Sequence, residues 1–256
     1  MSYKSIVVSV LLVAFLAGAS LFLMNRNNTE EEDVPEIISP DNSSDSAPQS
    51  FTFSNPKKSA HYESNTPEHA AILAAAPINI VINFNFDLAS PSSISITKDG
   101  QEYTTGDLII DSNKLTMRKA FDVNAPDGIY KVIYNACWPD RTCHDGSFEF
   151  AINRETASTY EDMTSVQEVE IKMSDIMFKP KNIKISRGTR VTWVNDESIA
   201  HYVNTDSHPA HTYHKQQNSS ALNLGDKYST VFSSPGIYPY HCSAHADVMT
   251  GNIIVI

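Results

Sequence analysis

Hydrophobic and polar residues alternate with a period of two along most of the chain after residue 67. One face of the segment 78–86 is almost purely apolar and carries Ile78, Ile80, Ile82, Phe84 and Phe86. Similar alternation recurs at 130–136, 148–153, 169–173 and 228–232, with turn signals such as Asp99-Gly100 between segments. A period of two is typical of strands with one buried face. The pattern therefore predicts an all-β chain of short strands.

The strands fall into two sets, which predict two β-sandwich domains at residues 68–153 and 166–256. The polar, poorly patterned segment 154–165 is expected to be a linker between them. Residues 25–67 are rich in Asn, Glu, Ser, Pro and Asp and contain few apolar residues, so we expect a disordered acidic spacer.

The N-terminal segment 1–24 contains an uncharged apolar run from Ser5 to Met24. About 20 apolar residues suffice for a helix to cross a bilayer. Lys4 precedes the run and an acidic stretch follows it, so the rest of the chain is expected outside the cytoplasm. We predict a single-pass membrane anchor with both sandwiches extracytoplasmic. A cleaved signal peptide is the alternative, because Ala17-Gly18-Ala19 resembles a cleavage site.

The charge balance restricts the possible partners. The chain has 19 Lys+Arg, 30 Asp+Glu and a formal net charge of −11. Nucleic-acid binding needs clustered basic residues for the phosphates, so no nucleic-acid partner is expected. The sequence also lacks a phosphate-binding loop, a dinucleotide fingerprint and a nucleophile elbow.

Most of the nine histidines lie in the last third, where they accompany a cysteine and a methionine. Cys242-x-x-His245-x-x-x-Met249 follows a predicted strand, and His201 lies on a loop between strands. One thiolate, two imidazoles and a weak axial thioether make up a type 1 copper site. The alternative is a buried free cysteine beside core histidines.

Residues 166–256 resemble the plastocyanin-like cupredoxin family. The matching motifs are Phe178-Lys179-Pro180, Arg187-Gly188-Thr189, Val191–Asn195, Ala200-His201, Gly236–His245 and Met249–Ile253. The resemblance implies a Greek-key sandwich with one type 1 copper held by His201, Cys242, His245 and Met249. It also implies an electron carrier that is not an enzyme and that docks transiently with redox partner proteins. Ser243 stands where multicopper oxidases carry a histidine, and no second cysteine accompanies Cys242, which argues against other copper centres.

Three further histidines, His208, His211 and His214, lie within seven residues. Imidazole is a good ligand for copper and zinc, so this segment is a candidate for a second copper. The alternative is a polar surface loop.

Residues 68–153 resemble the CopC-like copper-resistance domain, an immunoglobulin-like sandwich. The matching stretches are Asp127–Val132 and Asp145–Phe150. The resemblance implies a copper(II) site whose nearest counterparts here are His69 and His144, with Asp140 or Asp145. With this domain, copper handling by a chaperone, store or resistance factor is the alternative to electron transfer. A metal-free, adhesion-type double sandwich is the third possibility.

If Cys242 is a copper ligand, Cys137 and Cys143 remain as a pair. Disulfides persist in extracytoplasmic compartments, so we expect these two cysteines to be bonded. A Cys-Cys-His metal site with His144 is the alternative.

Overall fold

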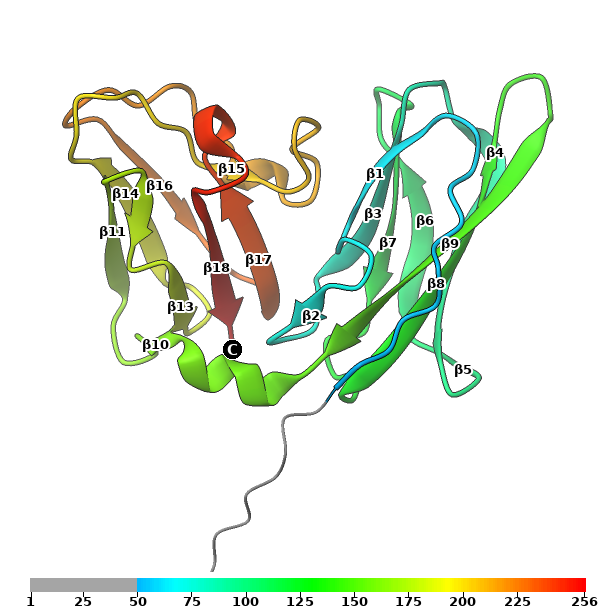
Figure 1. The fold of residues 1–256 in the computed structure, drawn as a ribbon, viewed down its shortest axis with the longest axis horizontal. Helices are drawn as coiled ribbons and strands as arrows, with labels where there is room; N and C mark the ends of the chain where they lie inside the picture. The colour runs from blue at the N-terminus through cyan, green and yellow to red at the C-terminus, as the bar shows by residue number, and fades with distance from the viewer. Residues whose placement is uncertain (1–49) are drawn as a thin grey trace, which may run out of the picture. The chain divides into compact units, whose positions relative to one another are not determined.

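The computed structural model describes residues 50–256 (Figure 1). The predicted membrane anchor at 1–24 and the spacer before residue 50 lie outside this range. Within it, no helix has the length and apolar character needed to span a bilayer. The regular structure of the described residues is almost entirely β-strand, and both sandwiches belong to one unit, Gln49–Ile256. The all-β prediction is confirmed.

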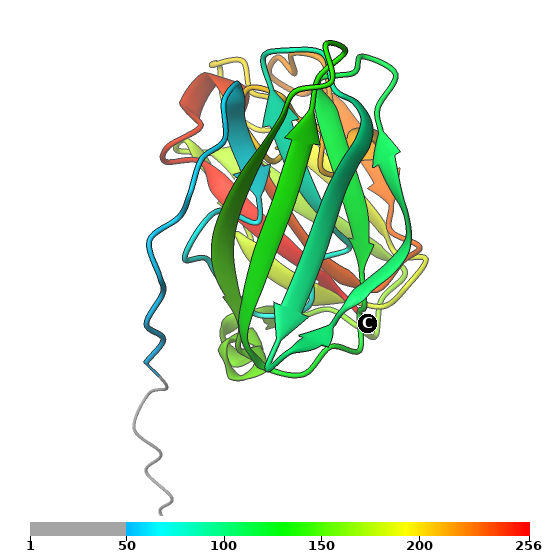
Figure 2. The same ribbon diagram turned by 90° about the vertical axis from the view of Figure 1, so that its right-hand side faces the viewer.

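The first sandwich consists of two antiparallel sheets, with one short parallel pairing, β2 with β9, at an edge. Their strand orders are β1-β3-β7-β6 and β2-β9-β8-β4-β5, and Figure 2 views the second sheet face on. The strands are β1 (Tyr62–Thr66), β2 (Ile72–Leu73), β3 (Asn79–Phe84), β4 (Ala89–Lys98), β5 (Gln101–Glu102), β6 (Thr104–Ile110), β7 (Thr116–Phe121), β8 (Gly128–Cys137) and β9 (Cys143–Ile152). Ile82 and Phe84 from one sheet pack in the same buried cluster as Tyr130 and Phe150 from the other.

The second sandwich also has two sheets, ordered β12-β11-β14-β16 and β10-β13-β18-β17-β15. Its strands are β10 (Glu161–Asp162), β11 (Glu168–Ser174), β12 (Met177–Lys179), β13 (Asn182–Ile185), β14 (Arg190–Asn195), β15 (Asn204–Thr205), β16 (Lys227–Val231), β17 (Gly236–His241) and β18 (Thr250–Val255). Three short 3₁₀ helices are η1 (Arg154–Thr159), η2 (Lys215–Gln217) and η3 (Ser243–His245). Trp193 is fully buried and meets Tyr240 edge to face, with ring centroids 5.4 Å apart, so the two sheets share one aromatic core.

Two predicted irregular segments contain regular structure. The spacer prediction is wrong for 62–66, because β1 pairs with β3 there and Lys57 forms a bridge with Ser147. Within the predicted linker 154–165, η1 is followed by β10, which pairs with β13 in the second sandwich. Both segments have too few apolar residues to show a period. Their strands are stabilised by hydrogen bonds to a neighbouring strand, which the sequence pattern does not reveal.

Strand β3 is buried on both faces, whereas its pattern predicts one exposed face. Asn83 accepts hydrogen bonds from Thr116 and Thr212, both at 2.9 Å, and donates one to the Ser207 hydroxyl at 3.1 Å. Thr212 and Ser207 belong to the second sandwich. The polar face of β3 therefore anchors the segment that carries His208 and His211.

The β8–β9 hairpin ends in a disulfide between Cys137 and Cys143, whose sulfur atoms lie 2.12 Å apart. These sulfurs are therefore not available as thiolates for the alternative Cys-Cys-His site. Among residues 50–256, Cys242 is the free cysteine, and it is buried.

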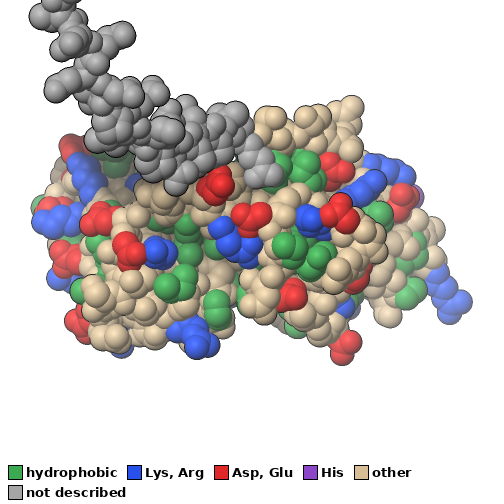
Figure 3. Space-filling view, turned by 90° about the horizontal axis from the view of Figure 1, so that it is seen from below, with side chains coloured by type: hydrophobic (Ala, Val, Ile, Leu, Met, Phe, Trp, Pro, Cys, Tyr) green, Lys and Arg blue, Asp and Glu red, His purple; other side chains and the backbone are tan. Residues whose placement is uncertain are grey.

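On the face drawn in Figure 3, Lys and Arg side chains are interspersed with Asp and Glu. Charges of mixed sign give that face no extended basic field of the kind that phosphate backbones require.

Candidate metal centre

Two segments of the second sandwich meet around Cys242, the stretch 242–249 and the connection that carries His201. Cys242 directly follows β17, η3 ends at His245, and Met249 precedes β18. His201 reaches the same place from the connection between β14 and β15, where its backbone pairs with Leu222 at 3.0 and 2.8 Å. The Asn195 amide donates to the carbonyls of Ile199 and Leu222 and so ties this connection to the sandwich.

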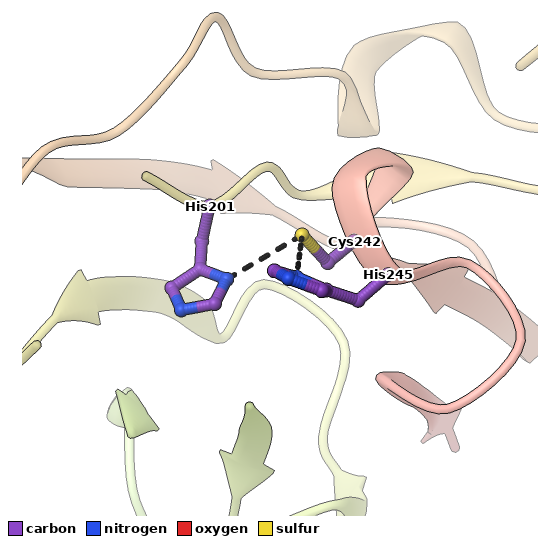
Figure 4. A group of neighbouring side chains, drawn as sticks. All are labelled: His201, Cys242 and His245. Carbon is purple, nitrogen blue, oxygen red and sulfur yellow. Dashed lines mark hydrogen bonds between the residues drawn. The ribbon is translucent and has the colours of Figure 1, made fainter. Parts of the chain in front are cut away.

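The Nδ1 atoms of His201 and His245 point at the Cys242 sulfur from distances of 3.5 and 3.6 Å (Figure 4). His201 and Cys242 are fully buried, while His245 is partly exposed. Metal–nitrogen and metal–sulfur bonds of about 2.0–2.3 Å in a trigonal plane separate the donor atoms by roughly 3.5–4 Å. The three donors therefore fit a metal ion without a change of fold, and this soft donor set suits copper.

Met249 is fully buried and packs in the same apolar cluster as Cys242. Its carbonyl accepts the Cys242 N–H, and its own N–H donates to the His245 carbonyl, both at 2.9 Å. The four-residue step from His245 therefore closes into a tight loop. Met249 is therefore held beside Cys242 and His245.

The Cys242 sulfur accepts a hydrogen bond from the Tyr202 backbone N–H at 3.3 Å. A donor to sulfur stabilises the thiolate form, which is the form that binds metal. Such bonds also adjust the reduction potential of copper–thiolate sites.

A carboxylate orients the His201 ring by contacting the nitrogen that faces away from Cys242. Glu197 Oε1 lies 2.7 Å from His201 Nε2 and also accepts the Ile176 backbone N–H at 3.0 Å. The hydrogen bond from Ile176 and, to a smaller extent, the contact with His201 lower the pKa of Glu197, so the carboxylate is ionised. His201 then carries its proton on Nε2, and the Nδ1 lone pair faces the sulfur.

We expect Glu197→Ala to weaken copper binding by about 10–100-fold, the usual cost of losing such an outer carboxylate. Glu197→Gln keeps an acceptor oxygen without the charge and should lose less. Competition with a copper chelator measures both variants, and Glu170→Gln is the matched control because Glu170 lies on the exposed face of β11. Equal affinity of Glu197→Ala and the control would contradict this role.

A second group of ligating side chains lies outside the Cys242 centre. It consists of His208, His211 and His241, whereas the sequence predicts His214 as the third member. The His214 ring instead packs against Tyr238 at 4.9 Å, and burial lowers its pKa to about 4.

His241 faces away from Cys242, as expected for neighbours along a strand. Burial is the largest cause that lowers the pKa of His211 to about 4, and the nearby His241 and His208 add to it. The His211 ring is therefore neutral at physiological pH.

The predicted CopC-type ligands have separate local partners. His69 Nδ1 accepts the Glu149 N–H, Asp140 caps Thr142, and Asp145 pairs with Lys57. His144 is exposed beside Trp138. The two groups of three or more ligating side chains found among residues 50–256 contain none of the four predicted ligands. A metal site in the first sandwich thus gains no geometric support.

Two carboxylates contact histidines of these groups without being indicated by the sequence pattern: Glu197 beside His201, and Asp206, whose Oδ1 lies 2.9 Å from His241 Nδ1. Both lie on loops, where spacing does not indicate which way a side chain points. Glu197 lies four residues before His201, but this spacing indicates a contact between the two side chains only when the loop conformation is known.

Two histidines and a cysteine with a methionine nearby are the donor set typical of type 1 copper sites. The family "Copper binding proteins, plastocyanin/azurin family" matches residues 165–256, and "CopC domain" matches residues 62–153. Amicyanin-alpha of Methylorubrum extorquens is 33% identical over 86 residues, which cover 34% of this chain and 70% of that protein. The chain belongs to the plastocyanin/azurin family of copper-binding proteins, and its cofactor is copper.

Solved structures also match part of the chain. A purple cupredoxin from Nitrosopumilus maritimus is 30% identical, with 34% of this chain and 99% of that chain covered and a TM-score of 0.31. An amicyanin variant in its oxidised form is 21% identical, with 39% of this chain and 89% of that chain covered and a TM-score of 0.31.

Proposed function

We propose that this protein carries single electrons outside the cytoplasm through a type 1 copper bound by His201, Cys242 and His245, with Met249 as the axial ligand. The convergence of two imidazole nitrogens on the buried Cys242 sulfur carries this proposal. When bound, copper supplies a one-electron couple. The sandwich supplies rigid ligands, and burial of Cys242 excludes water from the thiolate.

The partly exposed His245 is the proposed route for the electron, because the other ligands are buried. Apolar side chains on nearby loops are exposed: Val248 by 67%, Leu224 by 62% and Ile199 by 45%. Val248 lies between His245 and Met249, and Ile199 lies two residues before His201. An apolar surface of this kind suits brief docking through a small interface.

We expect Val248→Asp to slow electron self-exchange between reduced and oxidised copies of the protein. An added carboxylate at the docking surface would face its own copy, and like charges disfavour the encounter complex. NMR line broadening in mixtures of the two oxidation states measures the exchange rate.

Val166→Asp is the control. Val166 is also exposed and lies just before the start of β11. Strand β14 runs parallel to β11, and the connection that carries His201 follows the end of β14, so Val166 lies at the opposite end of this sheet. The control should exchange like wild type. Equal slowing by both substitutions would show that net charge matters and the Val248 surface does not.

The location proposed for these domains is extracytoplasmic, with residues 1–24 as a single-pass anchor. Domains of these two families are typically found outside the cytoplasm, and the Cys137–Cys143 disulfide is typical of oxidising compartments. In this role the protein transfers electrons to and from transient partner proteins and is not itself an enzyme.

Copper handling is the second candidate function, because the CopC domain match accompanies the copper-binding domain. A carrier of electrons keeps its copper in both oxidation states, whereas a copper donor releases it. Retention of copper on reduction therefore separates the two functions.

A further inference from the structure

We propose that His208, His211 and His241 form a second copper(II) site, distinct from the centre at Cys242. The two sites lie on opposite faces at the end of β17, because His241 and Cys242 are consecutive residues of an extended chain. The inference concerns metal binding alone and does not depend on the electron-carrier role.

The distances between the ring nitrogens match those of a coordinated ion. His211 Nε2 lies 3.3 Å from His208 Nδ1 and 3.2 Å from His241 Nε2. Metal–nitrogen bonds of about 2.0–2.1 Å in tetrahedral geometry place nitrogens roughly 3.3–3.4 Å apart. The donor atoms of all three rings lie within 4.8 Å of one another.

Hydrogen bonds within the group satisfy this arrangement only in part. Besides the two histidines, the Ser243 hydroxyl lies 3.1 Å from the same His211 nitrogen. A neutral ring nitrogen offers either one proton or one lone pair, so it cannot form good hydrogen bonds with all three neighbours. A cation bound between the rings would satisfy the converging lone pairs.

A carboxylate orients the His241 ring, just as Glu197 orients the His201 ring. Its Nδ1 lies 2.9 Å from Asp206 Oδ1, and the ring is 3% exposed. A proton on Nδ1 that bonds to the carboxylate leaves the Nε2 lone pair directed at His211. Such a carboxylate–histidine pair is the usual outer support of a metal ligand.

The loop that carries the other two histidines is also fixed in place. The His211 N–H donates to the Ser207 carbonyl at 2.8 Å, and the His211 carbonyl accepts from the Asn218 amide at 3.0 Å. Tyr213 is buried, and its hydroxyl bonds to the Ile237 carbonyl at 2.8 Å. Together with the Asn83 hydrogen bonds, these contacts hold the rings close together before any ion binds.

The ligand set favours copper(II) and leaves one side open. Three imidazoles bind copper more tightly than zinc according to the stability order of divalent ions. His208 is exposed and His211 is partly exposed, so solvent can occupy a further coordination position. No thiolate belongs to this group, so its copper should lack the intense visible band.

Copper counting tests the proposal on the full-length protein. After loading with excess Cu(II) and desalting, the wild type should keep two copper ions per chain. The second should show an electron paramagnetic resonance signal without an added visible band. A variant with both His208→Gln and His211→Gln should keep one copper and the full visible band, which also reports that the fold is intact.

Two further variants complete the test. His144→Gln, which changes an exposed histidine outside both groups, should keep two copper ions, and Cys242→Ser should keep one that is colourless. One copper ion in the wild type after desalting would mean an adventitious ion only and would overturn the site, as would two copper ions in the double variant. A colourless wild type that keeps its second copper would contradict the proposed electron carrier and leave this inference standing.

Discussion

Cys242→Ser is expected to abolish the intense visible absorption of the copper-loaded protein completely. That absorption arises from charge transfer between the thiolate and Cu(II), and serine offers a hard, weakly basic hydroxyl in its place. Cys242 is the one free cysteine of the described chain, and both histidine nitrogens converge on its sulfur. Absorption spectra of the copper-loaded full-length protein measure the effect.

The matched control for this experiment removes the other two cysteines. A variant with Cys137→Ser and Cys143→Ser loses the disulfide, which lies in the first sandwich, and should keep the band. Persistence of the band in Cys242→Ser, or its loss in the control with the second sandwich still folded, would contradict the assigned ligand.

Replacement of Met249 is expected to have the second large effect, a shift in the reduction potential of the copper. Met249→Leu removes the thioether at similar volume, so packing should change little. Loss of this donor favours Cu(I), and we expect the potential to rise by about 60 mV or more, which corresponds to a tenfold change in relative affinity for the two oxidation states. Met249→Gln supplies a harder oxygen donor and should lower the potential.

Voltammetry on both Met249 variants beside the wild type measures these shifts. Met173→Leu is the control, because Met173 is equally buried in the same cluster but lies on β11. Variants of Met249 that bind copper at an unchanged potential would show that another group, or none, occupies the axial position.

The sequence points to the group around Cys242 because its side chains have distinctive chemistry, and Cys242, His245 and Met249 lie within eight residues. Strand periodicity likewise predicts β3 and β8, which bury large apolar side chains. In contrast, β1 and β10 are short and polar and owe their structure to neighbouring strands. Their sequences carry no periodic signal.

The members of the second histidine group are harder to predict. Spacing along the chain favours His214, but that side chain packs against Tyr238, while His241 comes from a distant strand. Which histidines meet depends on how the loop 206–214 is anchored, through Asn83 and Tyr213. Such long-range hydrogen bonds are not visible in local sequence patterns.

Reversible redox cycling with copper retention tests the central claim most directly. The copper-loaded full-length protein is reduced, desalted under exclusion of oxygen, and reoxidised over several cycles while the visible band and the bound copper are measured. An electron carrier should bleach with one electron per type 1 copper, keep that copper in the reduced state, and recover the full band on each reoxidation. Loss of the type 1 copper on reduction would contradict the electron-transfer account and establish copper handling in its place.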